Sequence, residues 1–64
     1  MVTINGESEA VSGQILLDYL KEAGYDTKSV VVEINMEIIP REKWTDIVLK
    51  DEDTVEVLRF VGGG

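Results

Sequence analysis

Residues 1–4 alternate between apolar and polar side chains, and Asn5-Gly6 follows them. Val2 and Ile4 fall on one face of an extended strand. Asn-Gly favours a two-residue type I′ turn because both residues tolerate positive φ. The pattern predicts a β-hairpin with residues 7–10 as the return strand.

A helical pattern follows Ser12. Its apolar positions recur every three or four residues and form one stripe: Ile15, Leu16, Tyr19, Leu20 and Ala23. The Ser12 hydroxyl can accept a hydrogen bond from an early helical N–H group, and Gly24 can adopt the left-handed conformation that ends a helix. We therefore expect one helix of about three turns between Ser12 and Gly24.

Positions 29–34 are mostly β-branched and predict a central strand. We expect a turn at residues 35–37 and then a brief strand at residues 38–39. Pro40 ends that strand because proline has no N–H to donate. Residues 41–49 are mixed in character and predict one helical turn around Trp44, which we expect at the edge of the core.

The acidic turn at residues 51–53 leads to a last strand at residues 54–61. Counting by twos places Val55 and Val57 on the core face of this strand. The alternate positions then fall on the open face, where exposed apolar side chains favour an interface. We expect three residues to form a partner-binding patch there: Val31, Leu58 and Phe60.

Together these segments predict an α+β fold in which one helix covers one face of a mixed four- to five-stranded sheet. The first and last strands are expected to pair in the centre of the sheet. We expect a single domain over residues 1–61 and a flexible glycine tail over residues 62–64.

Composition narrows the possible functions. The chain has 64 residues, no cysteine and no histidine, so disulfides, thiolate metal sites and the usual nucleophile–base pairs are absent. Its net charge of −7 disfavours nucleic acid and anionic membranes and suits a partner with a basic surface. No apolar run approaches the roughly 20 residues that span a bilayer, so we expect a cytoplasmic protein.

The residues Gly62-Gly63-Gly64 are the strongest candidate for chemistry. The plainer interpretation is that the chain simply ends there. However, a segment without side chains is thin enough to enter the active site of another protein and to deliver the carboxylate of Gly64. That carboxylate can attack the α-phosphorus of ATP to give an acyl-adenylate. The catalytic groups and Mg²⁺ would then belong to the partner, and this chain would bind no cofactor.

Three segments together resemble the ThiS-type sulfur carriers of thiamine biosynthesis. They are Asn-x-x-x-Ile-Pro-Arg-x-x-Trp at residues 35–44, the acidic turn that begins at Asp51, and the Val-Gly-Gly-Gly terminus. The usual turn of the family reads Asp-Gly-Asp, so Glu52 departs from it. The resemblance covers the whole chain and implies a ubiquitin-like β-grasp fold.

The resemblance also implies a reaction cycle in which this chain is not the enzyme. An E1-like adenylyltransferase of the ThiF type activates the carboxylate of Gly64 with ATP and Mg²⁺. Sulfur from a cysteine desulfurase then gives a C-terminal thiocarboxylate, and thiazole synthase accepts that sulfur.

Three alternatives remain open on the sequence. One is the small subunit of a molybdopterin synthase, which also ends in a Gly-Gly thiocarboxylate. Another is a ubiquitin-like modifier that joins its carboxylate to lysines. The third is a β-grasp binding module whose tail has no role.

Overall fold

The structure is a computed structural model that describes residues 1–59. The elements in chain order are β1 (Val2–Ile4), β2 (Glu7–Glu9), α1 (Leu16–Glu22), β3 (Val30–Ile34), β4 (Glu37–Ile38), the 3₁₀ helix η1 (Arg41–Lys43) and β5 (Thr54–Arg59). Phe60 and the predicted tail at residues 62–64 lie outside the described residues. In the part of the chain that is described, no helix is long and apolar enough to cross a membrane.

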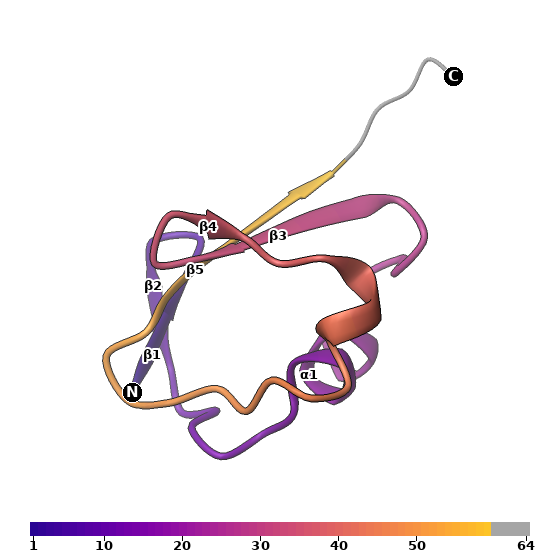
Figure 1. Cartoon of the computed structure of the whole chain (residues 1–64). Helices are drawn as coiled ribbons and strands as arrows, with labels where there is room; N and C mark the ends of the chain where they lie inside the picture. Colours follow the sequence, from indigo (N-terminus) through magenta and orange to yellow (C-terminus); the bar gives the residue numbers. More distant parts are fainter. Residues whose placement is uncertain (60–64) are drawn as a thin grey trace.

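The five strands form one mixed sheet in the order β2-β1-β5-β3-β4 (Figure 1). β5 runs parallel to β1 and antiparallel to β3. The first and last strands therefore pair in the centre of the sheet, as predicted. β3 lies inside the sheet next to β5, and the short strands β2 and β4 form the edges.

The core lies between one face of the sheet and α1, and the segment after η1 closes it from the side (Figure 1). Alternate residues of β1, β3 and β5 point into it, which gives β3 its buried–half-buried alternation. Its members are Val2, Ile4, Leu16, Tyr19, Leu20, Val30, Val32, Ile34, Trp44, Leu49, Val55 and Val57. The indole of Trp44 is 2% exposed, so this residue belongs to the core itself rather than to its edge.

The first hairpin has the predicted turn, since Asn5 and Gly6 have φ of 51° and 85°. The second hairpin differs from the prediction. Asn35 and Met36 form a two-residue turn with φ of 52° and 72°. Because this turn is one residue shorter than expected, Glu37 already pairs with Ile34, and β4 covers residues 37–38 rather than 38–39.

The helix begins later than predicted. α1 starts at Leu16, and the Ser12 hydroxyl donates a hydrogen bond to Asp51 instead of capping the helix. Backbone carbonyls of the 44–49 segment replace the side-chain cap. The N–H groups of Leu16 and Leu17 donate to the carbonyl oxygens of Ile47 and Trp44 at 2.8 and 3.1 Å. α1 therefore has seven residues, about two turns.

The predicted apolar stripe is only partly buried. Leu16, Tyr19 and Leu20 enter the core, whereas Ile15 and Ala23 are exposed because they lie beyond the ends of α1. Gly24 ends the helix as predicted, with φ of 88°. The N–H groups of Gly24 and Tyr25 donate to the carbonyls of Lys21 and Leu20, the pattern of a Schellman motif.

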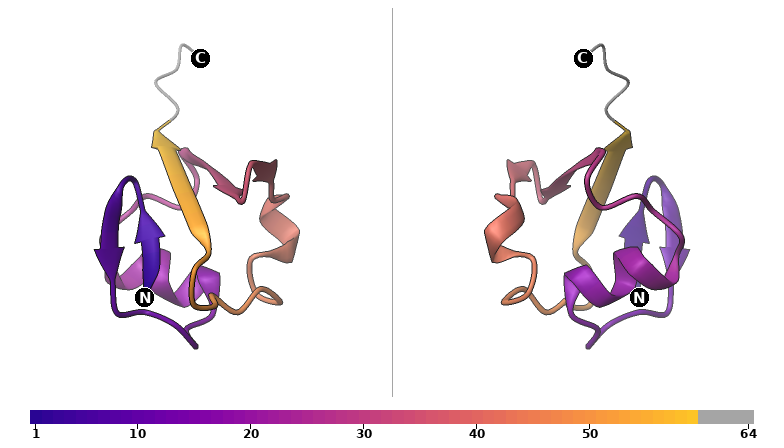
Figure 2. Two further views of the ribbon diagram at one scale, coloured as in Figure 1. Left: turned by 90° about the vertical axis from the view of Figure 1, so that its left-hand side faces the viewer. Right: turned by 90° about the vertical axis from the view of Figure 1, so that its right-hand side faces the viewer.

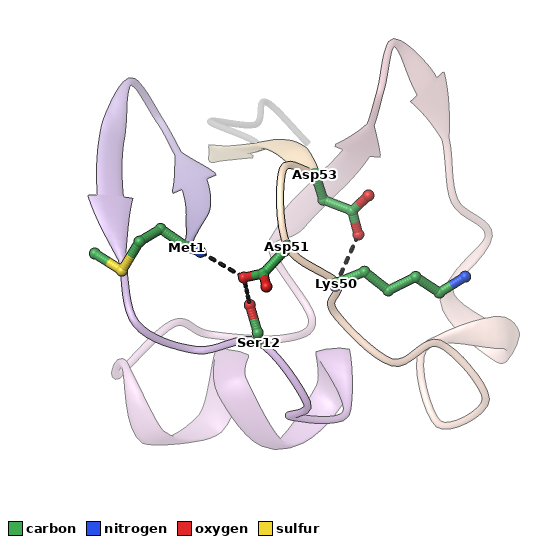
Figure 3. A network of polar contacts seen from close by, with 5 residues as sticks. All are labelled: Met1, Ser12, Lys50, Asp51 and Asp53. Carbon is green, nitrogen blue, oxygen red and sulfur yellow. Dashed lines mark hydrogen bonds and ion pairs between the residues drawn. The ribbon is translucent and has the colours of Figure 1, made fainter.

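The acidic turn ties β1 to the start of β5 (Figure 3). The carboxylate of Asp51 accepts hydrogen bonds from the amino group of Met1 and from the hydroxyl of Ser12. These bonds, the amino group first, lower the pKa of Asp51 from its ordinary value. The side chain of Asp53 accepts from the N–H of Lys50 at 3.0 Å. These contacts hold the starts of the parallel strands β1 and β5 together at one end of the molecule.

Replacing Glu52 by glycine is expected to stabilise the protein. Glu52 has φ of 72°, a conformation that costs an L-residue roughly 1–2 kcal/mol. Glycine avoids that cost but loses about 0.5–1 kcal/mol of chain entropy, which leaves a net gain of about 0.5–1 kcal/mol. Thermal unfolding should then show a midpoint a few degrees higher. Glu52→Ala is the matched control, because it removes the carboxylate but keeps Cβ; an equal gain in both variants contradicts the explanation.

Candidate functional site

The candidate site surrounds the C-terminal end of β5. Leu58 and Arg59 are the last described residues of this strand. The C-terminal end of β5 lies at the opposite end of the molecule from the N-terminus (Figure 2). Of the residues predicted to act there, Gly62, Gly63, Gly64 and Phe60 lie outside the described residues. The structure therefore describes the base from which the tail starts.

The open face of the sheet carries an apolar cluster beside this end. Val31 of β3 lies directly opposite Leu58 of β5, so the two predicted residues share the open face. Ile38 of β4 lies opposite Glu33, one position along the same face. Leu58 is 46% exposed and Ile38 is 66% exposed. We call Val31, Ile38 and Leu58 the open-face patch.

The sequence pattern did not indicate Ile38 as part of this patch. Its position depends on the length of the turn at Asn35-Met36, because the two-residue turn fixes the register that brings Ile38 opposite Glu33.

Two carboxylates adjoin the open-face patch. Glu33 of β3 and Glu56 of β5 lie directly opposite each other in the antiparallel register. Like charges in this position repel and weaken a sheet. The pair therefore gives the open face a local negative charge that a basic group of another molecule would relieve.

The side chain of Asn5 fixes β5 just before the site. Its Oδ1 accepts the N–H of Val57 at 2.8 Å, and its Nδ2 donates to the carbonyl of Val57 at 3.4 Å. Its backbone N–H donates to Val55 at 2.9 Å. β1 ends at Ile4, so its backbone does not pair with Val57. The side-chain amide of Asn5 makes these two hydrogen bonds to Val57 instead. The strand is held on this side up to the residue before Leu58.

Asn35 makes a similar contact at the other end of β5. Its Nδ2 donates to Asp53 at 3.1 Å and its Oδ1 accepts the N–H of Thr54 at 3.0 Å. Its own N–H donates to the carbonyl of Thr54 at 2.8 Å. The first residue of the Asn-x-x-x-Ile-Pro-Arg-x-x-Trp segment therefore joins the β3–β4 turn to the start of β5.

The rest of that segment is built around Trp44. The indole Nε1–H donates to the carbonyl of Ile39 at 3.0 Å. The guanidinium of Arg41 lies 5.4 Å from the centre of the indole ring, within the range of a cation–π contact. Pro40 precedes η1, where its fixed φ and missing N–H are tolerated. The segment is thus a structural brace, and it leaves Arg41 at the surface.

Asn5→Ala is expected to weaken the protein by about 2–3 kcal/mol. The buried N–H of Val57 loses its acceptor, which costs roughly 1–3 kcal/mol, and alanine is strained at the positive φ of this turn. Urea unfolding measures the loss. In Asn5→Gly the same hydrogen bonds are removed without the strain, so its loss should be about 1–2 kcal/mol. Two variants as stable as the parent would show that the Asn5 amide does not hold β5.

Within residues 1–59, no group of three or more carboxylates is placed to hold a metal ion. The described end of β5 presents apolar, acidic and basic side chains around the strand that leads to the tail. This arrangement is typical of a surface that binds a protein.

Comparison with known proteins shows which family the chain resembles. The model of the ThiS family matches residues 2–64. A sulfur carrier protein ThiS of Thermus thermophilus is 38% identical over 64 residues, which covers 100% of both chains. The crystal structure of a thiamine biosynthesis protein (ThiS) from Geobacter metallireducens superposes with a TM-score of 0.80 at 31% identity and covers 98% of this chain and 97% of that one. The fold is therefore the ubiquitin-like β-grasp.

A second kind of relative is much longer. A thiazole synthase of Paramagnetospirillum magneticum is 36% identical over 64 residues, which is 98% of this chain but 20% of that protein. The chain thus spans about a fifth of the length of this relative. A region similar to this chain occurs there within a protein named for the formation of the thiazole.

Proposed function

This chain belongs to the ThiS family of sulfur carriers in thiamine biosynthesis, and from that membership we propose that its own Gly64 carries the sulfur as a thiocarboxylate. The observation that supports the proposal is the sequence position of the three glycines, separated by two residues from the described end of β5, the strand that the sheet pairs on both sides.

The proposed activation step takes place in a partner of the E1-like, ThiF type. A carboxylate oxygen of Gly64 attacks the α-phosphorus of ATP, the bond to the β-phosphate breaks, and pyrophosphate leaves. The partner supplies Mg²⁺ and the catalytic groups, so this chain acts as a protein co-substrate rather than as an enzyme. Three glycines suit this step because an arm without side chains fits a narrow channel.

The proposed sulfur transfer follows on the acyl-adenylate. A persulfide sulfur, formed from cysteine by a desulfurase, attacks the acyl carbon, and AMP leaves. A thiol then cleaves the sulfur–sulfur bond and leaves one sulfur on the carbon of Gly64. A chain without cysteine has no side-chain thiol to interfere with this exchange.

The proposed acceptor is a thiazole synthase, and the proposed contact surface is the open-face patch together with Phe60. The patch is apolar and exposed, and it adjoins the strand end from which the tail starts. The facing pair Glu33 and Glu56 favours a partner with a basic group at that point.

Incubation with ATP, Mg²⁺, a ThiF-type enzyme and a persulfide source is the test. We expect the intact mass of the protein to increase by the exchange of one oxygen for one sulfur, and thiazole synthase to consume the product. A mass that does not change under these conditions would refute the proposal. An adduct with lysine side chains that survives hydroxylamine and strong reductant would support a protein modifier instead.

A further inference from the structure

Three of the six basic residues gather where β3 begins and β5 ends: Lys28, Arg41 and Arg59. Lys28 and Arg41 line a cavity of about 270 Å³ together with Ser29, Val30 and Val31. Val30 lies opposite Arg59 in the β3–β5 register, so the cavity adjoins the end of the strand that leads to the tail. We call the residues around this cavity the basic cleft.

The basic cleft exists because β4 is short. β4 pairs with Glu33 and Ile34, and the N–H of Ile39 donates to the carbonyl of Val32 at 2.9 Å. No strand covers the edge of β3 at Val30 and Val31 in the described part of the chain. The chain turns away into η1 at this point, and Arg41 then faces Lys28 across the open edge, with its Nη2 donating to the Lys28 carbonyl at 3.3 Å.

The cationic side chains of the cleft form no ion pair with a carboxylate within 4 Å among residues 1–59. The one ion pair within 4 Å in this range joins Met1 to Asp51, at the opposite end of the molecule. Asp26 lies on the same loop as Lys28. Its two carboxylate oxygens accept hydrogen bonds from the N–H of Lys28 at 3.1 Å and from the hydroxyl of Ser29 at 2.9 Å.

The hydrogen bonds to Asp26, first that from the Lys28 N–H and then that from Ser29, lower the pKa of this carboxyl group, and the charges of Lys28 and Arg59 lower it further. Asp26 is therefore ionised at neutral pH. Lys28, Arg41 and Arg59 thus gather at one place in a chain whose net charge is −7.

Arg41 is already oriented for binding. Its guanidinium is held over the indole of Trp44 at 5.4 Å and by the hydrogen bond to the Lys28 carbonyl. A guanidinium has five N–H donors in a planar fork, so further donors remain for a carboxylate. Because the group is held in place, less side-chain entropy is lost when it binds.

We propose that the basic cleft receives an acidic side chain, glutamate or aspartate, of the protein that engages the C-terminal tail. The volume lies near the lower limit of the roughly 300–1,000 Å³ of small-molecule pockets and is large enough to admit one side chain. Val31 contacts its aliphatic stem, and Lys28 and Arg41 contact its carboxylate. This inference rests on the proposed function for the identity of the partner, but not for the chemistry of the cleft.

The proposal predicts how opposite charges are arranged on the surface of the partner. A basic group of the partner faces Glu33 and Glu56, and an acidic group faces Lys28 and Arg41. Reversed docking would bring like charges together at both points, which costs several kcal/mol. The two contacts thus fix the direction in which the tail enters the partner.

The first test needs no enzyme. The ¹⁵N-labelled protein is titrated with the tripeptide acetyl-Ala-Glu-Ala-amide at millimolar concentration, and the amide shifts are followed. We expect saturable shifts at residues 28–31 and at Arg41, no shifts with the glutamine peptide, and a loss of the shifts in Lys28→Gln. Lys21→Gln on the exposed side of α1 is the matched control and should respond like the parent. Equal shifts with both peptides, or an unchanged response of Lys28→Gln, would overturn the proposal.

The second test uses the ThiF-type enzyme and steady-state adenylation. Lys28→Glu is expected to raise KM about tenfold with kcat unchanged within about twofold, because the contact positions the protein but takes no part in the chemistry. Lys21→Glu makes the same change in net charge and should stay within about twofold of the parent. Equal effects of the two variants would refute the cleft while the proposed function stands. If the parent protein is not adenylated, the proposed function is wrong. The peptide titration then still tests whether the basic cleft binds an acidic side chain.

Discussion

Removing Gly64 is expected to abolish the ATP-dependent formation of the proposed thiocarboxylate and to leave the fold intact. The deletion moves the terminal carboxylate back by about 3.3–3.6 Å, the length of one extended residue. A misplacement of about 1 Å at a reacting centre can cost a hundredfold in rate, so we expect at least that loss. Intact-mass analysis after incubation with the activating enzyme measures it.

Deleting any one of Gly62, Gly63 or Gly64 gives the same chain, so the deletion tests reach rather than the identity of one glycine. A semisynthetic protein of full length with a C-terminal amide is the complementary control, because it keeps the reach and removes the carboxylate. Both variants should unfold at the urea concentration of the parent. An unchanged yield after the deletion would contradict the tail mechanism.

Trp44→Ala is expected to remove a large part of the free energy of unfolding of the protein. Trp44 is 2% exposed, donates to Ile39, and accepts the Leu17 N–H through its own carbonyl. Truncating a buried tryptophan costs about 3–5 kcal/mol. At about 0.05–0.15 kcal/mol per residue, a domain of this length has only roughly 3–10 kcal/mol in total. Far-UV circular dichroism during urea unfolding measures the loss without requiring the fluorescence of the indole.

Trp44→Phe separates the two contributions of this side chain. Phenylalanine keeps much of the buried volume but cannot donate to the Ile39 carbonyl, so we expect a loss of about 1–3 kcal/mol. If Trp44→Ala loses less than about 1 kcal/mol, Trp44 does not hold the segment after β4 against the core.

The strands were the most predictable part of the fold. The alternation in β1, β3 and β5 correctly placed Val55 and Val57 in the core and Leu58 outside it. The Asn5-Gly6 turn was also predicted correctly. These features depend on neighbours in the sequence, since side-chain direction in a strand alternates residue by residue.

The start of the helix was less predictable, because a distant segment determines it. Ser12 has the right chemistry for a cap, but Asp51 takes its hydroxyl and the 44–49 segment supplies the acceptors for the first helical N–H groups. The β3–β4 turn was predicted in the right place but one residue too long. Met36 at positive φ is rare for its residue type, so the sequence favoured a longer turn there.

For the candidate site, the sequence indicated the glycines and two of the three residues of the open-face patch, Val31 and Leu58. The basic cleft was not predicted. Lys28, Arg41 and Arg59 are separated by 12 residues or more, and only the early end of β4 and the β3–β5 register bring them to one place. The net charge of −7 also gives no sign of a local positive region, because a total charge does not say where the charged residues lie in the fold.

The sequence by itself determined the strand faces, the two glycine-dependent local structures at Gly6 and Gly24, and the family to which the chain belongs. These depend on residue type and spacing alone. Only the tertiary structure decided where α1 begins, that Asn5 and Asn35 hold β5 from its two sides, and that opposite charges lie on the two sides of the strand end. Those features come from contacts between residues 13 to 52 positions apart, which residue spacing does not specify.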